Sequence, residues 1–214
     1  MTIALPIPGK REPVSTKSLS TALKTFILLF SLAICNGISA QIVLIDPATV
    51  GGFESSTTFA GNGWSVANGA ATNRVWYCGT GQTGYTGARA AFIGNSATNV
   101  GANTANRVVH LYRPVTIPVG ATNITLTFKY KQAASDYVSP TVYDGMNVYL
   151  DPATPTGGTT TTFPPVASRI YGPFPTANIT TYTTQTVTIP NTYATGVATN
   201  LIFTWFGETV SPHG

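Results

Sequence analysis

Residues 75–84 contain the residue types and the spacing of a dinucleotide-binding turn. Gly79, Gly81 and Gly84 follow a short apolar run in a G-x-G-x-x-G pattern. In a dinucleotide-binding fold a helix begins at these glycines, and an acidic residue about 20 positions later binds the ribose. Here no amphipathic helix follows, and the next acidic residue is Asp136. We therefore interpret the segment as a hairpin loop and predict no nucleotide cofactor.

Thiol and imidazole groups are too few to indicate nucleophilic catalysis. Cys78 is the only cysteine after residue 40, and a catalytic thiol needs a nearby base, for which only His110 and His213 are present. We interpret Cys78 as a small buried apolar side chain. His110 and Arg113 have opposite parity on an extended segment, so they are expected on opposite faces. For His110 we expect a cross-strand hydrogen bond or a surface position.

The chain lacks the sequence motifs of common enzymes. It has no nucleophile elbow, no H-E-x-x-H motif, no paired C-x-x-C and no Walker loop. The six carboxylates after residue 40 could supply a glycosidase pair, because that chemistry needs two facing acids, but they do not cluster on one segment. We predict a protein that is not an enzyme.

The first 40 residues have the pattern of a secretory signal peptide. Four basic residues precede an apolar run at residues 26–34, and a small residue, Ala40, precedes the expected cleavage point. The run is shorter than the roughly 20 residues of a membrane span. Cys35 raises a lipoprotein as the alternative, but Ile34 is larger than the residue that normally precedes a lipidated cysteine. We predict a secreted or cell-surface protein with a signal peptide at 1–40.

Charge is distributed unevenly in the chain. Residues 41–214 contain seven basic and six acidic side chains, a net charge of +1, so the alkaline isoelectric point belongs largely to the leader and predicts no nucleic-acid binding. Residues 55–135 contain no acidic residue. We expect their basic side chains on solvated faces, with an anion-binding surface as the alternative. These side chains are Arg74, Arg89, Arg107, Arg113, Lys129 and Lys131.

Residues 41–214 are predicted to form one all-β domain, because about nine short apolar runs are separated by Gly, Pro and Asn. No segment has sustained helical periodicity. Alternation of apolar and polar residues predicts an antiparallel β-sandwich of the jelly-roll type. The Pro-, Gly- and Thr-rich stretch 151–165 is expected as an exposed loop between strands. The apolar positions that share a face are Ile124, Leu126, Phe128 and Tyr130, then Val109, Leu111, Val115 and Ile117, and Met146, Val148 and Leu150.

Four segments resemble the sandwich modules of large secreted Bacteroidetes surface proteins. They are GFESSTTFAGNGWSVANG (52–69), TGARAAFIGNS (86–96), VVHLYRPVTIPVGATNITLTFKYK (108–131) and YDGMNVYLDPATPTGGT (143–159). In that family the modules are related in form to carbohydrate-binding jelly rolls and occur in multi-domain chains exported by the type IX pathway. The family continues with one more strand after the segment that corresponds to 199–208. The resemblance therefore implies a fragment without its last strand, in which residues 201–206 have an unpaired, aggregation-prone edge.

The resemblance implies a non-catalytic adhesion or glycan-binding module whose partner is an extracellular glycan or a surface protein. Trp64, Trp76, Tyr77 and Tyr85 are the candidate ligand-binding residues, because aromatic faces stack on sugar rings. Core packing is the alternative for each of the four aromatics, above all for the two tryptophans. The alternative function is an accessory module of an exported peptidase or glycosidase whose catalytic domain lies elsewhere in the protein.

The resemblance also implies a structural calcium ion. Glu54 stands in the segment GGFESS, which resembles the opening of jelly-roll modules in which a glutamate after Phe helps to hold calcium. Asp144 is the candidate second ligand, because it shares parity with the apolar positions that follow it. Carboxylate and carbonyl oxygens suit Ca²⁺. The alternative is a solvated Glu54 and a turn-forming Asp144.

Overall fold

The computed structural model describes residues 41–100, 107–132, 137–138, 141–142, 145–158, 162–174 and 179–207. The predicted signal peptide and Asp144 lie outside the described residues. From Val43 onward the chain forms one compact unit, and its regular structure consists of antiparallel strands with three short 3₁₀ turns. The prediction of an all-β antiparallel sandwich is confirmed. In the described ranges, no helix is long and apolar enough to cross a membrane.

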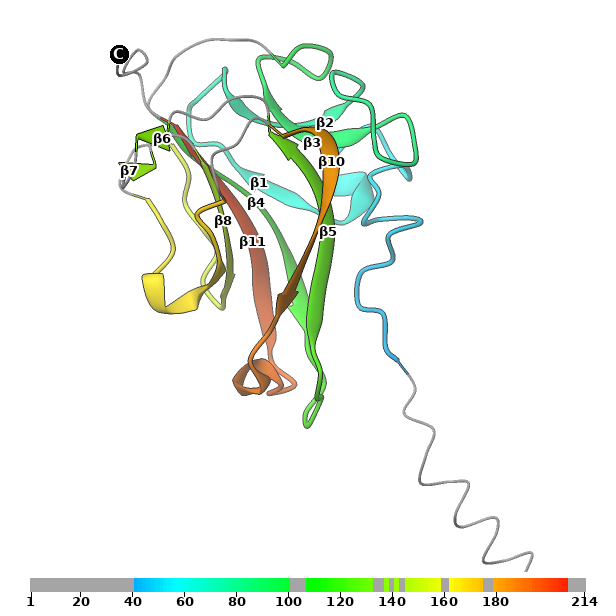
Figure 1. Cartoon of the computed structure of the whole chain (residues 1–214), viewed down its shortest axis with the longest axis vertical. Coiled ribbons are helices and arrows are strands. Elements are labelled where there is room, and N and C mark those ends of the chain that lie inside the picture. The colour runs from blue at the N-terminus through cyan, green and yellow to red at the C-terminus, as the bar shows by residue number, and fades with distance from the viewer. Residues whose placement is uncertain are drawn as a thin grey trace, which may run out of the picture. The chain divides into compact units, whose positions relative to one another are not determined.

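A five-stranded antiparallel sheet forms one layer of the sandwich (Figure 1). Along its central strands, alternate side chains point into the core and away from it. In spatial order the strands are β1 (Ser65–Ala67), β4 (Arg107–Thr116), β11 (Ala198–Gly207), β8 (Gly145–Asp151) and β9 (Arg169–Tyr171).

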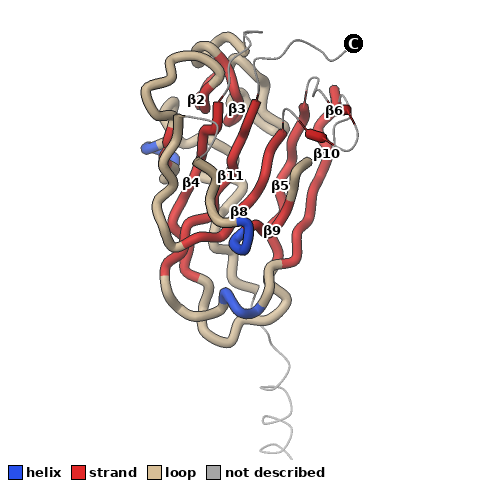
Figure 2. Tube along the Cα trace, turned by 90° about the vertical axis from the view of Figure 1, so that its left-hand side faces the viewer, coloured by secondary structure: helices blue, strands red, loops and turns tan. Residues whose placement is uncertain are grey.

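Two two-stranded sheets contribute side chains to the same core. They are the pairs β5 (Thr125–Gln132) with β10 (Ile179–Thr188) and β2 (Val75–Gly79) with β3 (Ala90–Gly94). The two-residue strands β6 (Tyr137–Val138) and β7 (Thr141–Val142) pair with each other. Three 3₁₀ turns are drawn in blue in Figure 2: η1 (Ala60–Asn62) before β1, η2 (Val166–Ser168) before β9, and η3 (Asn191–Tyr193) between β10 and β11.

The core lies between β5 and the centre of the five-stranded sheet. The ring of Phe128 on β5 meets Phe203 on β11 edge to face, with centroids 5.2 Å apart, and Phe174 at 5.7 Å. Such contacts add to the free energy gained from burying apolar surface. The apolar residues predicted to share a face do so: Val109, Leu111, Val148 and Leu150 are buried, and Leu126 and Tyr130 pack against them.

The loop after β8 covers the outer face of the five-stranded sheet. Gly158 N–H donates to the carbonyl of Val108 at 2.9 Å, and the Asn200 side chain donates to the carbonyls of Pro152 and Ala153. Most of the loop's own side chains are exposed, as the sequence predicts. Ile202 and Thr204, beneath it on the outer face, are nevertheless fully buried. The centre of this sheet is therefore buried on both faces.

The expectation of an unpaired edge at residues 201–206 is wrong. β11 is a central strand, paired with β4 along its whole length and with β8 from Asn200 to Phe206. Its backbone N–H and C=O groups therefore have partners on both sides. The edges of this sheet are β1 and β9, with three residues each, and short edges limit unwanted pairing.

Candidate functional site

Two of the four predicted ligand-binding aromatics belong to the core. Trp64 and Trp76 are 5% and 8% exposed. Their indole N–H groups donate to the carbonyls of Val50 and Val109, at 3.0 and 3.2 Å. A buried tryptophan with its N–H satisfied stabilises packing and offers no face to a sugar. The prediction that these two rings stack on a ligand is corrected accordingly.

Tyr77 stabilises the base of the β2–β3 hairpin. It is half-buried, and its hydroxyl lies within hydrogen-bonding distance of the carbonyls of Thr72 and Asn95, at 3.3 and 3.2 Å. Tyr85, in the loop of the same hairpin, is 55% exposed. Of the four predicted aromatics, Tyr85 is the one that presents a ring to solvent.

Tyr85 belongs to a cluster of tyrosines and lysines that we call the Tyr85 surface. Its members are Thr83 and Tyr85 from the hairpin loop, Lys129 and Lys131 from β5, and Tyr182 and Thr184 from β10. Lys129 Nζ lies 3.7 Å from the centre of the Tyr85 ring and donates to Thr184 Oγ1 at 3.1 Å. Tyr182 meets Tyr85 edge to face, with ring centroids 5.8 Å apart.

Strand register brings this surface together from three segments. Alternation on β5 places Leu126, Phe128 and Tyr130 toward the core, so Lys129 and Lys131 project outward. β10 pairs with β5 so that Thr184 lies opposite Lys129. The Tyr182 hydroxyl donates to the carbonyl of Thr83, which ties the hairpin loop to β10. Burial raises the pKa of Tyr182, so this hydroxyl remains protonated at neutral pH.

Sequence reasoning missed Tyr182 as a member of a site, and it named Lys129 and Lys131 only within the alternative of an anion-binding surface. The available signal was the pair of lysines at alternate positions on the polar face of an amphipathic strand. The other four basic side chains of residues 55–135 all contact groups within the fold. Arg89 pairs with Glu54, Arg74 and Arg113 lie over Trp205 and Trp64, and Arg107 donates to Asn73.

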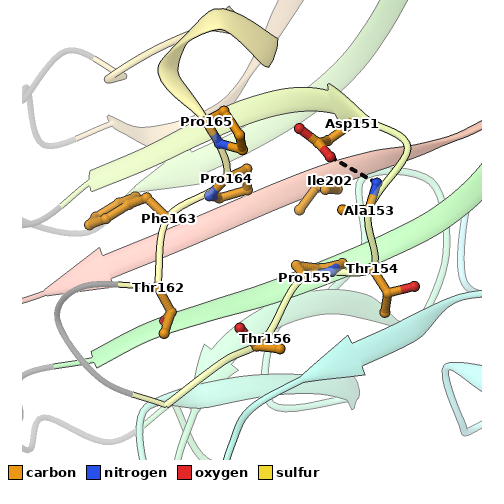
Figure 3. Close-up of a pocket in the computed structure, with 10 residues that line it drawn as sticks. All are labelled: Asp151, Ala153, Thr154, Pro155, Thr156, Thr162, Phe163, Pro164, Pro165 and Ile202. Atoms are coloured by element: carbon orange, nitrogen blue, oxygen red, sulfur yellow. Dashed lines mark hydrogen bonds between the residues drawn. The ribbon is translucent and has the colours of Figure 1, made fainter.

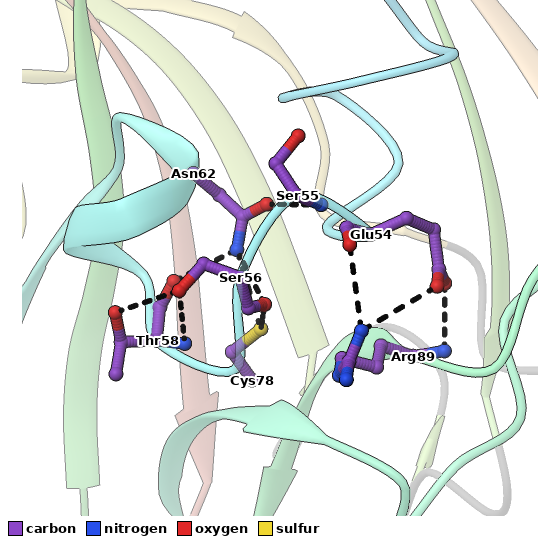
Figure 4. Close-up of polar contacts among 7 residues, drawn as sticks. All are labelled: Glu54, Ser55, Ser56, Thr58, Asn62, Cys78 and Arg89. Atoms are coloured by element: carbon purple, nitrogen blue, oxygen red, sulfur yellow. Dashed lines mark hydrogen bonds and ion pairs between the residues drawn. The ribbon is translucent and has the colours of Figure 1, made fainter.

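Glu54, the predicted calcium ligand, contacts Arg89 (Figure 4). Its Oε1 accepts the backbone N–H of Arg89 at 2.7 Å, and its Oε2 lies 3.8 Å from the guanidinium. A cation beside this carboxylate would lie close to a positive charge, so Glu54 in this arrangement does not fit a calcium site. Among the described residues, no three His, Cys, Asp or Glu side chains gather as a metal site would require.

Cys78 is buried under the loop before η1 (Figure 4). The Asn62 amide, itself fully buried, donates to the carbonyls of Ser56 and Thr58 at 2.9 and 2.7 Å and lies 3.8 Å from Cys78 Sγ. Burial raises the pKa of the Cys78 thiol, with a smaller contribution of the same sign from Glu54, while Arg89 opposes the shift. The neutral thiol is a poor nucleophile, in agreement with a packing role.

The glycine pattern of residues 79–84 forms a hairpin, as predicted. β2 and β3 pair antiparallel, with Gly79 opposite Ala90. None of the three glycines has a positive φ. They are needed for close packing instead: a side chain at Gly79 would overlap the carbonyl of Ala97, and one at Gly84 would overlap that of Arg89.

His110 and Arg113 project from opposite faces of β4, as predicted. Arg113 lies over Trp64 on the inner side, whereas His110 Nδ1 forms a cross-strand hydrogen bond with Thr204 Oγ1 on β11, at 2.9 Å. The ring is fully buried and its Nε2 has no hydrogen-bond partner. Burial lowers the pKa of His110 to about 4, although the backbone groups of Thr156 and Thr162 oppose this shift.

A pocket of about 340 Å³ opens on the outer face of the five-stranded sheet (Figure 3). Two arms of the loop, residues 153–156 and 162–165, form its walls, with Ile202 between them. The Asp151 carboxylate, at one end, accepts the N–H of Ala153 at 2.8 Å. The walls are chiefly proline, threonine and Phe163, and they place no second acid beside Asp151. The pocket could admit a small apolar group but lacks paired acid and base groups.

Comparison of the chain with protein-family models, with curated proteins and with solved structures finds no match. The function is therefore argued from the geometry of the described residues.

Proposed function

We propose that this chain is an exported, non-catalytic module that binds glycans outside the cell through the Tyr85 surface. The observation that carries the proposal is the exposed ring of Tyr85, 55% accessible and fixed by Lys129 and Tyr182. A sugar ring can pack its C–H face on such a tyrosine. Because neighbouring residues already hold this ring, binding a ligand costs less conformational entropy.

Polar groups around the ring suit the hydroxyl groups of a saccharide. Thr83 and Thr184 are exposed, and the Lys129 ammonium lies beside Tyr85. An aromatic platform surrounded by a few oriented donors and acceptors gives both affinity and orientation to a ligand. The pocket near Phe163 is the competing site, because the Asp151 carboxylate and three threonines line it beside an aromatic ring, but that ring is 39% exposed against 55% for Tyr85.

Affinity electrophoresis of the purified chain in gels that contain neutral and acidic polysaccharides tests the proposal. We expect retardation by at least one polymer. Tyr85→Ala should weaken it about tenfold or more, as expected for loss of a central aromatic contact, while Tyr85→Trp should preserve it. Phe163→Ala is the matched control, since this ring is 39% exposed and lies on the outer face of the five-stranded sheet.

Loss of binding in Tyr85→Ala with an unchanged melting temperature supports the proposal. Absence of retardation by every polymer, or retardation that Tyr85→Ala leaves unchanged, contradicts it. Loss of binding in Phe163→Ala alone would move the site to the pocket.

A further inference from the structure

We propose that the Tyr85 surface selects acidic glycans, and that Lys129 and Lys131 bind a carboxylate or sulfate group of the saccharide. The inference rests on the proposed function and specifies its ligand. The two lysines are two positions apart on β5 and project from the same face, so their Cβ atoms lie about 7 Å apart. Two ammonium groups at this spacing can approach one anionic group from two sides.

Among the described residues, no carboxylate balances the charge of these two lysines. The groups that face them from β10 and from the hairpin loop are Tyr182, Thr184 and Tyr85. Burial raises the pKa of Tyr182, so its hydroxyl is neutral. In the part of the chain that the structure describes, neither ammonium forms an ion pair with a carboxylate. The repulsion between two neighbouring cations would be relieved by a bound anion.

Lys129 is held in place, and its ammonium group still has N–H donors that can bind a ligand. An ammonium has three N–H donors, and Lys129 uses one for Thr184 while the Tyr85 ring packs against its charge. Lys131 Nζ lies 5.1 Å from the Tyr182 ring. The aromatic rings thus position the two charges next to the platform on which a sugar would stack. A saccharide that carries an acidic group can use both features together.

The charge of the chain favours a saccharide over a nucleic acid. Nucleic-acid binding depends on many phosphate contacts, whereas residues 41–214 carry a net charge of +1 and the surface presents two lysines. An ammonium is a point charge without the planar fork of arginine, so the two lysines suit a carboxylate and a sulfate alike.

Binding should be measured for matched polymer pairs with the full chain. One pair is polygalacturonate and its carboxyl-reduced form, and the other is a sulfated galactan and its desulfated form. We expect the acidic member of at least one pair to bind about tenfold more tightly, as two surface ion contacts allow, and salt to remove the difference. The pair whose acidic member binds more tightly shows whether the surface prefers a carboxylate or a sulfate group.

Lys129→Gln and Lys131→Gln should each weaken binding of the acidic polymer about two- to fivefold, the size expected for one exposed ion pair. Binding of the neutral polymer should weaken less than binding of the acidic polymer, so the preference for the acidic polymer should fall in both variants. Lys131→Arg should retain the preference for the acidic polymer. Arg169→Gln is the matched control, because it removes one positive charge from an exposed position on β9.

Equal affinity for both members of each pair, with binding still dependent on Tyr85, would overturn the inference and leave the proposed function intact. Failure to bind any polymer would contradict the proposed function itself. Comparable binding of single-stranded DNA that also depends on Lys129 and Lys131 would mean a general polyanion site and would overturn the preference for glycans.

Discussion

Glu54 accepts the backbone N–H of Arg89 at 2.7 Å and lies 3.8 Å from its guanidinium. The contact joins the segment before η1 to the end of the hairpin loop that carries Tyr85, directly before β3. Gly87 allows the approach, because a side chain there would overlap the Glu54 carboxylate. One half-buried carboxylate thus helps to fix the loop that forms the candidate binding surface.

Glu54→Ala should lower the free energy of unfolding by about 1 to 2 kcal/mol, because it leaves the Arg89 N–H without its acceptor. Glu54→Gln keeps an oxygen at that position and loses the charge, so we expect a smaller effect. Urea denaturation measures both variants, with the exposed Ser55→Ala as control. Equal losses for Ala and Gln would assign the effect to the charge alone and contradict the hydrogen-bond argument.

The calcium prediction from the sequence requires the Glu54 carboxylate to exchange Arg89 for a metal ion. If the site forms, with Asp144 as a second ligand, calcium raises the melting temperature and a chelator lowers it. Glu54→Gln must abolish both shifts. A midpoint that is the same with calcium and with chelator would eliminate the site, as would a calcium-dependent shift that survives Glu54→Gln.

Asn62→Ala should lower the free energy of unfolding by roughly 2 to 3 kcal/mol, because it removes buried hydrogen bonds to Ser56 and Thr58. It should also expose Cys78 to thiol reagents, since the Asn62 amide lies against its sulfur. In the native protein we expect slow modification, because burial raises the pKa of this thiol. Rapid modification of the native protein, or a rate that Asn62→Ala leaves unchanged, would contradict this account.

The strands could be predicted from the sequence because alternation determines which side chains share a face. The polar positions of β5 and the opposite orientations of His110 and Arg113 follow from parity alone. The neighbours of a strand do not follow from parity, since any strand with one apolar face fits several places in a sheet. For this reason the central position of β11, between β4 and β8, was not predicted.

The exposure of the aromatics could not be predicted from local pattern either. Trp64 follows η1 outside any strand, and its ring packs against Phe53 and against Phe203, which is distant in sequence. Tyr85 lies in a glycine-rich loop, and its contacts with Lys129 and Tyr182 form only when the hairpin lies beside β5 and β10. The candidate surface is therefore a product of tertiary structure, although its lysines were predicted on a polar face.

The fold should lose stability in acid because of one buried histidine. His110 is fully buried and has a pKa of about 4 in the folded chain, against an ordinary value of 6.5. Between these pH values the unfolded chain binds a proton that the folded chain excludes, so stability is fully present above pH 6.5 and falls as the pH drops toward 4. The shift corresponds to a loss of roughly 3 kcal/mol over this window.

His110→Gln should flatten the pH dependence of the free energy of unfolding between pH 6.5 and about 4.5, because glutamine does not titrate there. It should also be less stable at pH 7, since the cross-strand bond to Thr204 changes. His213→Gln, which removes the other histidine of residues 41–214, should retain the wild-type slope. If His110→Gln does not fold, an NMR titration of the wild-type protein measures the pKa of the His110 ring directly. A His110 that titrates near 6.5 would contradict the argument, because the buried imidazole would then accept a proton without cost to the fold.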